Sequence, residues 1–116
     1  MAKKIMYDSE EDILSLSKGT KVKASIDVGD FVIDVDHSGF VVGIEILNAS
    51  QNLGVKEEQL KSLEEASMNV MYKPNYVLVT LFLKSAKKEK EVVIPLTVDL
   101  GHALVKSEKT RFAVGA

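Results

Sequence analysis

The sequence predicts a small α+β domain: an antiparallel, strongly twisted sheet of about six to eight short strands with one main helix packed on it. Apolar and polar residues alternate along most of the chain, which is the period of strands that bury one face. Only residues 55–66 place apolar side chains at helical spacing. The whole chain, 1–116, is short enough to be one domain and long enough to bury one core.

The segments before residue 30 are short and strand-like. Residues 3–7 form the first candidate strand, and residues 9–12 are polar and turn-forming. Residues 13–16 alternate and favour a strand, although a helical turn capped by Ser9 also fits residues 9–17. Residues 20–28 alternate apolar and polar positions throughout, which predicts a strand with one buried face.

Residues 31–47 are the clearest element and predict a hairpin around the turn 37–39. Both arms alternate, and glycine after serine favours a tight turn because glycine tolerates positive φ. A two-residue loop would pair Val35 with Val42, Ile33 with Ile44 and Asp34 with Gly43. A loop of odd length would instead place Asp34 opposite Val42 on the apolar face, so we expect the even loop. The residues expected to be buried are Ile33, Val35, Val42, Ile44 and Ile46.

The second half of the chain begins with the main helix, 55–66, whose thin apolar stripe contains Leu60 and Leu63. A second strand group, 68–98, follows, and we expect its strands at 68–72, 76–83 and 91–98 with a charged loop at 84–90. Pro95 lacks an N–H donor, so the last of these strands is expected at an edge or a bulge. Asp99 is expected to cap a short helix, and residues 107–116 are expected to form a frayed tail.

The composition argues against several classes of protein. A formal net charge of −2 and a pI near 5.7 give no general attraction to nucleic acids or to anionic membranes. The absence of cysteine excludes disulfides, thiolate nucleophiles and cysteine-based zinc sites. The longest apolar run, 76–83, is far shorter than the roughly 20 residues of a membrane helix. With no signal-peptide pattern at the N-terminus, we expect a cytoplasmic protein that needs no cofactor.

A set of carboxylates is the main candidate for a ligand or metal site. Clustered carboxylates can bind a hard cation or transfer protons, although charges also line the wet face of any antiparallel sheet. The second interpretation is favoured, because no metal-binding spacing supports the first and the two histidines, His37 and His102, are far apart. The candidate residues are Asp8, Asp12, Asp34, Asp36 and Glu45.

An apolar surplus at 76–83 predicts an interface. This strand is apolar on both faces apart from Thr80, whereas antiparallel sheets normally leave one face wet. One thin helix cannot cover both rows, so we expect self-association, with a two-fold dimer as the commonest form. The candidate interface residues are Leu78, Leu81 and Phe82.

The first half of the chain resembles a known family. Tyr7-Asp8, Glu11-Asp12, Asp34-Val35-Asp36, Gly39 and the run at 43–50, GIEILNAS, are similar to a family of short archaeal and bacterial proteins catalogued as a domain of unknown function. The resemblance implies no catalytic residues. Because some relatives are encoded beside small toxin-like proteins, it implies an antitoxin-like role that binds another small protein.

These observations lead to three hypotheses. We expect a non-enzymatic interaction module that binds itself. The alternatives are an antitoxin-like protein that binds a different partner, and an enzyme that uses the carboxylates with a metal or small ligand.

Overall fold

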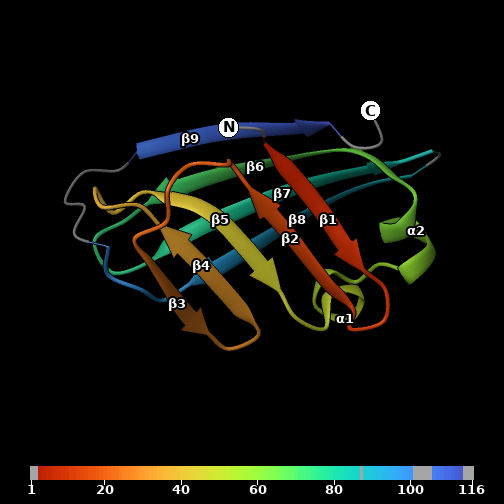
Figure 1. Ribbon diagram of the computed structural model, residues 1–116, viewed down its shortest axis with the longest axis horizontal. Coiled ribbons are helices and arrows are strands. Elements are labelled where there is room, and N and C mark those ends of the chain that lie inside the picture. The colour runs from red at the N-terminus through yellow and green to blue at the C-terminus, as the bar shows by residue number, and fades with distance from the viewer. Residues whose placement is uncertain (1–2, 87, 101–105, 114–116) are drawn as a thin grey trace.

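A computed structural model describes residues 3–86, 88–100 and 106–113, which form two antiparallel sheets packed face to face (Figure 1). The first sheet has the order β1-β2-β5-β4-β3, and the second has the order β8-β7-β6-β9. Sheet one comprises β1 Lys4–Asp8, β2 Ile13–Ser17, β3 Ala24–Val28, β4 Phe31–Val35 and β5 Val41–Ile46. Sheet two comprises β6 Leu63–Tyr72, β7 Val77–Ser85, β8 Lys88–Leu96 and β9 Lys106–Ala113.

The predicted α+β class with one main helix is wrong, because the described chain is mostly β. The connection between the sheets holds two five-residue helices, α1 Ala49–Leu53 and α2 Glu57–Lys61, at one end of the molecule (Figure 1). Leu60 and Leu63 do have helical spacing, but α2 ends at Lys61 and Leu63 begins a strand. The antiparallel pairing is as expected.

The strand β6 occupies part of the segment expected to be helical, and a bulge explains why its pattern is hard to recognise. Its register with β7 shifts between Leu63 and Glu65, so two charged residues follow each other before regular alternation begins. From Ala66 to Tyr72 every second side chain is buried. Two adjacent glutamates between Leu63 and Ala66 look like the polar side of a helix, whereas a bulge produces the same spacing in a strand.

The hydrophobic core lies between the two sheets. One cluster of buried side chains joins the inner residues of both, including Leu16 and Ile44 from the first sheet and Val79 and Leu81 from the second. A hydrogen bond also crosses the interior, where the backbone N–H of Val41 donates to the Tyr72 hydroxyl at 2.8 Å. The first sheet therefore covers the inner face of β6, β7 and β8, which the predicted helix was expected to cover.

The central hairpin has a different loop from the expected one. Asp36 and Phe40 are hydrogen-bonded across the turn, so the loop has the three residues 37–39, and Gly39 has the expected positive φ of 83°. The pairing then shifts between Asp34 and Val35, and Val35 pairs with Val41 rather than with Val42. This bulge absorbs the odd residue, which keeps Asp34 opposite Gly43 and Ile33 opposite Ile44 as predicted.

The ends of both sheets also differ from expectation. Strand β3 begins only at Ala24, and Val22 before it is 43% exposed. Residues 84–90 are not a loop over their whole length, because Lys84 lies in β7 and Lys88 begins β8. The expected frayed tail at 107–116 is wrong up to Ala113, since β9 pairs with β6 over its full length. The short helix expected after Asp99 falls at 101–105, outside the described residues, as does His102. Pro95 lies in the edge strand β8, as predicted.

Candidate functional site

The five candidate carboxylates do not form one site. Among the described residues, no three His, Asp or Glu side chains come close enough to hold a metal ion. Asp8 and Glu45 line a shallow hollow of about 370 Å³ on the outer face of the first sheet, beside Met6, Tyr7, Ile13 and Ser15. The other three candidates lie elsewhere and make hydrogen bonds within the fold.

Asp12 lies in the β1–β2 turn and forms hydrogen bonds with the start of α1. It has a positive φ of 56°. Its carboxylate accepts hydrogen bonds from the Tyr7 hydroxyl at 2.6 Å, the Ser50 hydroxyl at 2.7 Å and the Ser50 N–H at 3.1 Å. Burial alone would raise the pKa of Asp12, but these hydrogen bonds favour the charged form and lower it. Burial, followed by the hydrogen bond to Asp12, raises the pKa of Tyr7, so this cluster is structural and unsuited to proton transfer near neutrality.

Asp34 and Asp36 also hold local structure. Asp34 accepts a hydrogen bond from the Ser25 hydroxyl at 2.6 Å, which joins β3 to β4. Asp36 accepts from the backbone N–H groups of Ser38 and Phe40, at 2.9 and 3.0 Å, and so closes the hairpin turn. This is a common role for aspartate in turns. The favoured interpretation of these residues as charges on a wet sheet face therefore fits their contacts.

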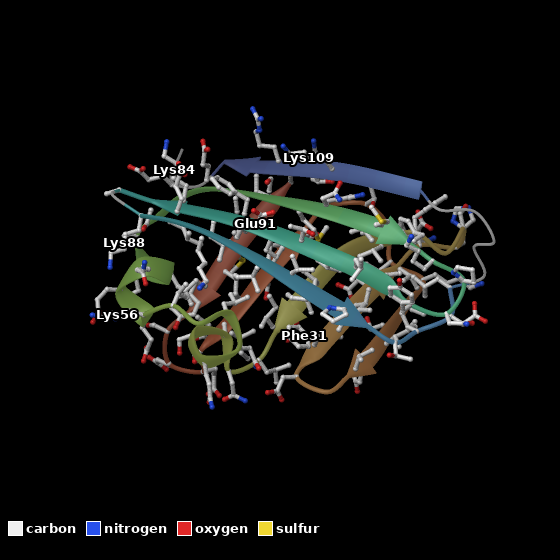
Figure 2. The ribbon with its side chains drawn as sticks, turned by 180° about the vertical axis from the view of Figure 1, so that it is seen from behind. Phe31, Lys56, Lys84, Lys88, Glu91 and Lys109 are labelled. Atoms are coloured by element: carbon white, nitrogen blue, oxygen red, sulfur yellow. The ribbon has the colours of Figure 1, made fainter. Side chains whose placement is uncertain are left out.

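The more distinctive surface is the outer face of the second sheet, which Figure 2 shows from the front. We call it the outer face of sheet two and define it by the side chains of β6 to β9 that point away from the core. Its apolar part contains Met71, Leu78, Phe82, Val93 and Pro95. Val93 is 57% exposed, while Leu78 and Phe82 are partly exposed. Its polar part contains Glu65, Ser67, Asn69, Thr80, Lys84, Glu91, Lys109 and Arg111.

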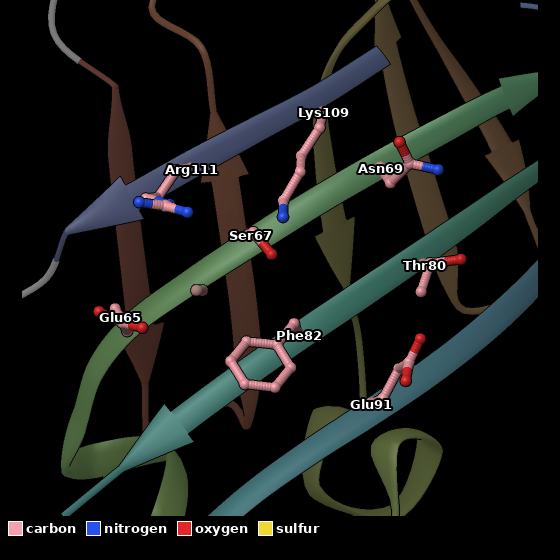
Figure 3. A pocket seen from close by; sticks show the side chains of 9 residues that line it. Glu65, Ser67, Asn69, Thr80, Phe82, Glu91, Lys109 and Arg111 are labelled. Carbon is pink, nitrogen blue, oxygen red and sulfur yellow. The ribbon is translucent and has the colours of Figure 1, made fainter. Parts of the chain in front are cut away.

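A hollow of about 510 Å³ occupies the middle of this face (Figure 3). Arg111 and Lys109 project from β9 on one side, and Glu91 projects from β8 on the opposite side. Phe82 lies between them on β7, and uncharged polar side chains of β6 and β7 line the floor. The hollow is open to solvent and is lined by charged, polar and aromatic side chains of the described strands, which a binding surface can use.

The candidate interface residues divide between the two sides of the sheet. Leu81 is 0% exposed and belongs to the core, so it is unavailable as an interface residue. Leu78 and Phe82 point the other way and lie on the outer face of sheet two. One row of this strand is therefore internal and the other points outward, and the internal row is covered by the first sheet rather than by the predicted helix.

Sequence reasoning missed Lys109 and Arg111 because it treated their segment as a tail. The signal was present in the sequence, since these two exposed cations alternate with Thr110 and Phe112, which are 5% and 1% exposed. A four-residue alternation close to a chain end, after a segment rich in charge, is too short to distinguish from a frayed end.

Comparison with known proteins adds a family but no activity. The family described as "Protein of unknown function (DUF2283)" matches residues 4–50. An uncharacterised protein of Methanocaldococcus jannaschii is 37% identical over 95 residues, which cover 80% of this chain and 82% of that protein. A Methanosarcina mazei protein with the provisional name hypoxanthine phosphoribosyltransferase is 25% identical over 87 residues, covering 74% of this chain and 71% of that protein. No solved structure matches the chain.

The segment that matches the family spans the first sheet and the start of α1. Its recognisable residues have structural roles: Asp12 and Ser50 are joined by hydrogen bonds, and Gly43 lies against Asp34 and the Leu16 carbonyl. The second sheet, which carries the outer face, lies beyond this segment. No described helix is long and apolar enough to cross a membrane.

Proposed function

The chain belongs to the DUF2283 family of proteins of unknown function, and we propose that it is a non-enzymatic interaction module that binds a second copy of itself through the outer face of sheet two. The observation that carries this proposal is the row Met71, Leu78 and Pro95, three apolar residues adjacent in register on a face that no described element covers. Antiparallel sheets normally place polar residues on such a face, and contiguous apolar patches on proteins mark interfaces.

The opposite face of the molecule supports the choice of this surface. The outer face of the first sheet carries Ser15, Asp34 and Glu45, together with the glycine of β5. Its apolar residues Met6 and Val32 are separated in register by Ser15 and Glu45, so no row of adjacent apolar residues crosses this face. The two outer faces therefore differ in character, and the more apolar one is the better candidate for contact between copies.

An enzymatic function is less well supported. Phosphate and nucleotide sites are commonly built where a glycine-rich loop leads into a helix whose N-terminus points at the ligand. Both described helices have only five residues, and the glycines preceding them are not arranged in such a loop. The activity in the name of the Methanosarcina mazei relative is therefore not proposed for this chain.

Sedimentation equilibrium of three proteins tests the proposal. We expect the wild type to show a reversible monomer–dimer equilibrium and Leu78→Asp to remain a folded monomer, because its carboxylate would be buried unpaired in the contact. Val22→Asp is the matched control: Val22 is also exposed and apolar, but it precedes β3 on the first sheet. This control should dimerise like the wild type.

Circular dichroism is recorded first, to check that each variant keeps its β structure, and the monomer–dimer equilibria are compared only afterwards. If the wild type is monomeric at every concentration, self-association is refuted. If Leu78→Asp and Val22→Asp both dimerise like the wild type, the protein self-associates through a different surface. Only the first result would favour the hypothesis that another small protein is the partner.

A further inference from the structure

The charges on the outer face of sheet two are sorted by strand. The edge strand β9 presents the cations Lys109 and Arg111, and the opposite edge strand β8 presents Glu91. The strand registers place Arg111 beside Ser67, Ser67 beside Phe82, and Phe82 beside Glu91, so the cation and the anion lie at the two ends of one row across the sheet.

Arg111 and Glu91 are too far apart to pair within one chain. Three strand spacings of about 4.8 Å separate them, which is about 14 Å between their backbones. Figure 3 shows both side chains over the hollow, on opposite sides of it. The face therefore presents one positive and one negative edge, each available to a charged group that approaches from outside the molecule.

We infer that two copies meet about a two-fold axis that runs parallel to β6 and β7, over the line between them. This inference rests on the proposed function and specifies its geometry. Such an axis stacks β9 of one copy over β8 of the other without shifting along the strands. It places Arg111 over the partner's Glu91, and by symmetry Glu91 over the partner's Arg111.

The same operation also pairs the two central strands, although Lys109 then lies over the partner's Val93 rather than over an anion. It stacks β6 over the partner's β7, which places Met71 over the partner's Leu78 and Glu65 over the partner's Lys84. The alternative two-fold axis in this plane, perpendicular to the strands, would stack β9 on β9 and β8 on β8. Cations would then face cations at one edge, and this repulsion selects the parallel axis.

The twist of packed sheets does not remove these pairs. Aligned sheets cross at about 30°, and the edge strands lie about 7 Å from the axis, so the two edges shift relative to each other by roughly 4 Å. Extended arginine and glutamate side chains can span a shift of this size. The two strands nearest the axis, β6 and β7, shift less, so their apolar residues stay closer to their partners.

The area of the outer face of sheet two indicates how large the contact between two copies can be. Four strands about 4.8 Å apart, with about seven residues each at about 3.3 Å, give roughly 440 Å² on each copy in flat projection. The total of about 900 Å² in flat projection corresponds to a contact at the small end of the range for specific complexes. We therefore expect a weak dimer with a dissociation constant in the micromolar range.

Mixing two charge-reversed variants tests the geometry. Arg111→Glu alone places glutamate opposite glutamate at both edges of the dimer, and Glu91→Arg alone places arginine opposite arginine. Each should weaken dimerisation about tenfold, since like charges face each other twice. In the mixture, each heterodimer contains one native and one reversed pair, so dimerisation should return to the wild-type strength. Glu57→Arg, a charge reversal on α2 outside the contact, is the control and should dimerise like the wild type.

The possible outcomes separate this inference from the proposed function. Recovery in the mixture, measured by sedimentation equilibrium, supports the parallel axis. If both variants dimerise weakly and their mixture does not recover, the proposed axis is wrong but self-association through this face still stands. The same conclusion follows if the single variants dimerise like the wild type. A wild type that never dimerises refutes the proposed function itself.

Discussion

Replacing Tyr72 by phenylalanine should destabilise the protein by removing one oxygen atom from the boundary between the two sheets. Tyr72 is 0% exposed at the end of β6, and its hydroxyl accepts the N–H of Val41 at 2.8 Å. Val41 begins β5 at the bulge in the central hairpin and is itself 0% exposed. The substitution keeps the aromatic ring, including its edge-to-face contact with Phe40 at 5.6 Å between centroids.

The magnitude follows from the burial of the donor. An N–H group that loses its acceptor in the interior costs about 1–3 kcal/mol, because water cannot replace the lost hydrogen bond. With a urea m value of about 2 kcal/mol/M, the unfolding midpoint should fall by roughly 0.5–1.5 M. Hydrogen exchange gives a local measure, and the amide of Val41 should lose protection relative to the wild type.

Tyr76→Phe is the matched control, since it removes the same atom from a tyrosine that is 38% exposed just before β7. Its effect should stay within about 0.5 kcal/mol, as expected for surface substitutions. An unchanged midpoint for Tyr72→Phe, together with unchanged protection at Val41, would refute the assignment of this hydrogen bond as a link between the sheets.

Two further predictions concern the first sheet. Asp12→Asn retains a residue type that tolerates positive φ but loses the charged acceptor, so it should lower stability by about 1–3 kcal/mol at pH 7. The folded pKa of Asp12 lies below its ordinary value of 3.8. The stability difference between wild type and Asp12→Asn should therefore persist down to about pH 5 and shrink as the pH falls through the folded pKa. A difference in urea midpoints that does not change with pH would contradict the role of the charge. Gly43→Ala should lower the melting temperature, since its Cβ would lie 3.0 Å from Asp34 Oδ2 and 3.1 Å from the Leu16 carbonyl oxygen. In an uncrowded strand the same change would stabilise the protein, so a raised melting temperature would contradict the close approach.

Strands with regular alternation could be predicted from the sequence because burial of one face leaves a period of two. Residues 13–16 were correctly favoured as a strand, and Leu14 and Leu16 are both buried. The pairs Ile33–Ile44 and Asp34–Gly43 were also predicted correctly. In each case the alternation of side chains determines which residues face the core.

Two of the parts that failed are those where a bulge interrupts the alternation. The extra residue near Val42 changed the hairpin loop, and the irregularity at Leu63–Glu65 made the start of β6 resemble a helix. The fold class failed for a related reason. Pairing between two sheets depends on contacts between distant segments, such as Val41 with Tyr72, which no local period reveals.

The candidate site was predicted only in part. The apolar surplus at 76–83 drew attention to Leu78 and Phe82, which lie on the outer face of sheet two, but alternation alone could not show which row would be covered by the other sheet. The charged half of the face depends on Lys109 and Arg111, whose place beside β6 follows from long-range pairing. The acidic candidates attracted attention by their charge, although Asp8 and Asp36 accept hydrogen bonds within turns and Asp12 and Asp34 accept them from Ser50 and Ser25 of other segments.

Amide chemical shifts recorded as a function of protein concentration test the central claim most directly. If copies meet through the outer face of sheet two, the amides of Asn69, Thr80 and Phe82 should shift or broaden between about 5 and 500 µM, a range that brackets a micromolar dissociation constant. The amides of Ser15 and Asp34, on the outer face of the first sheet, should not change. Concentration-dependent shifts confined to the first sheet, or no shifts across this range, would contradict the account.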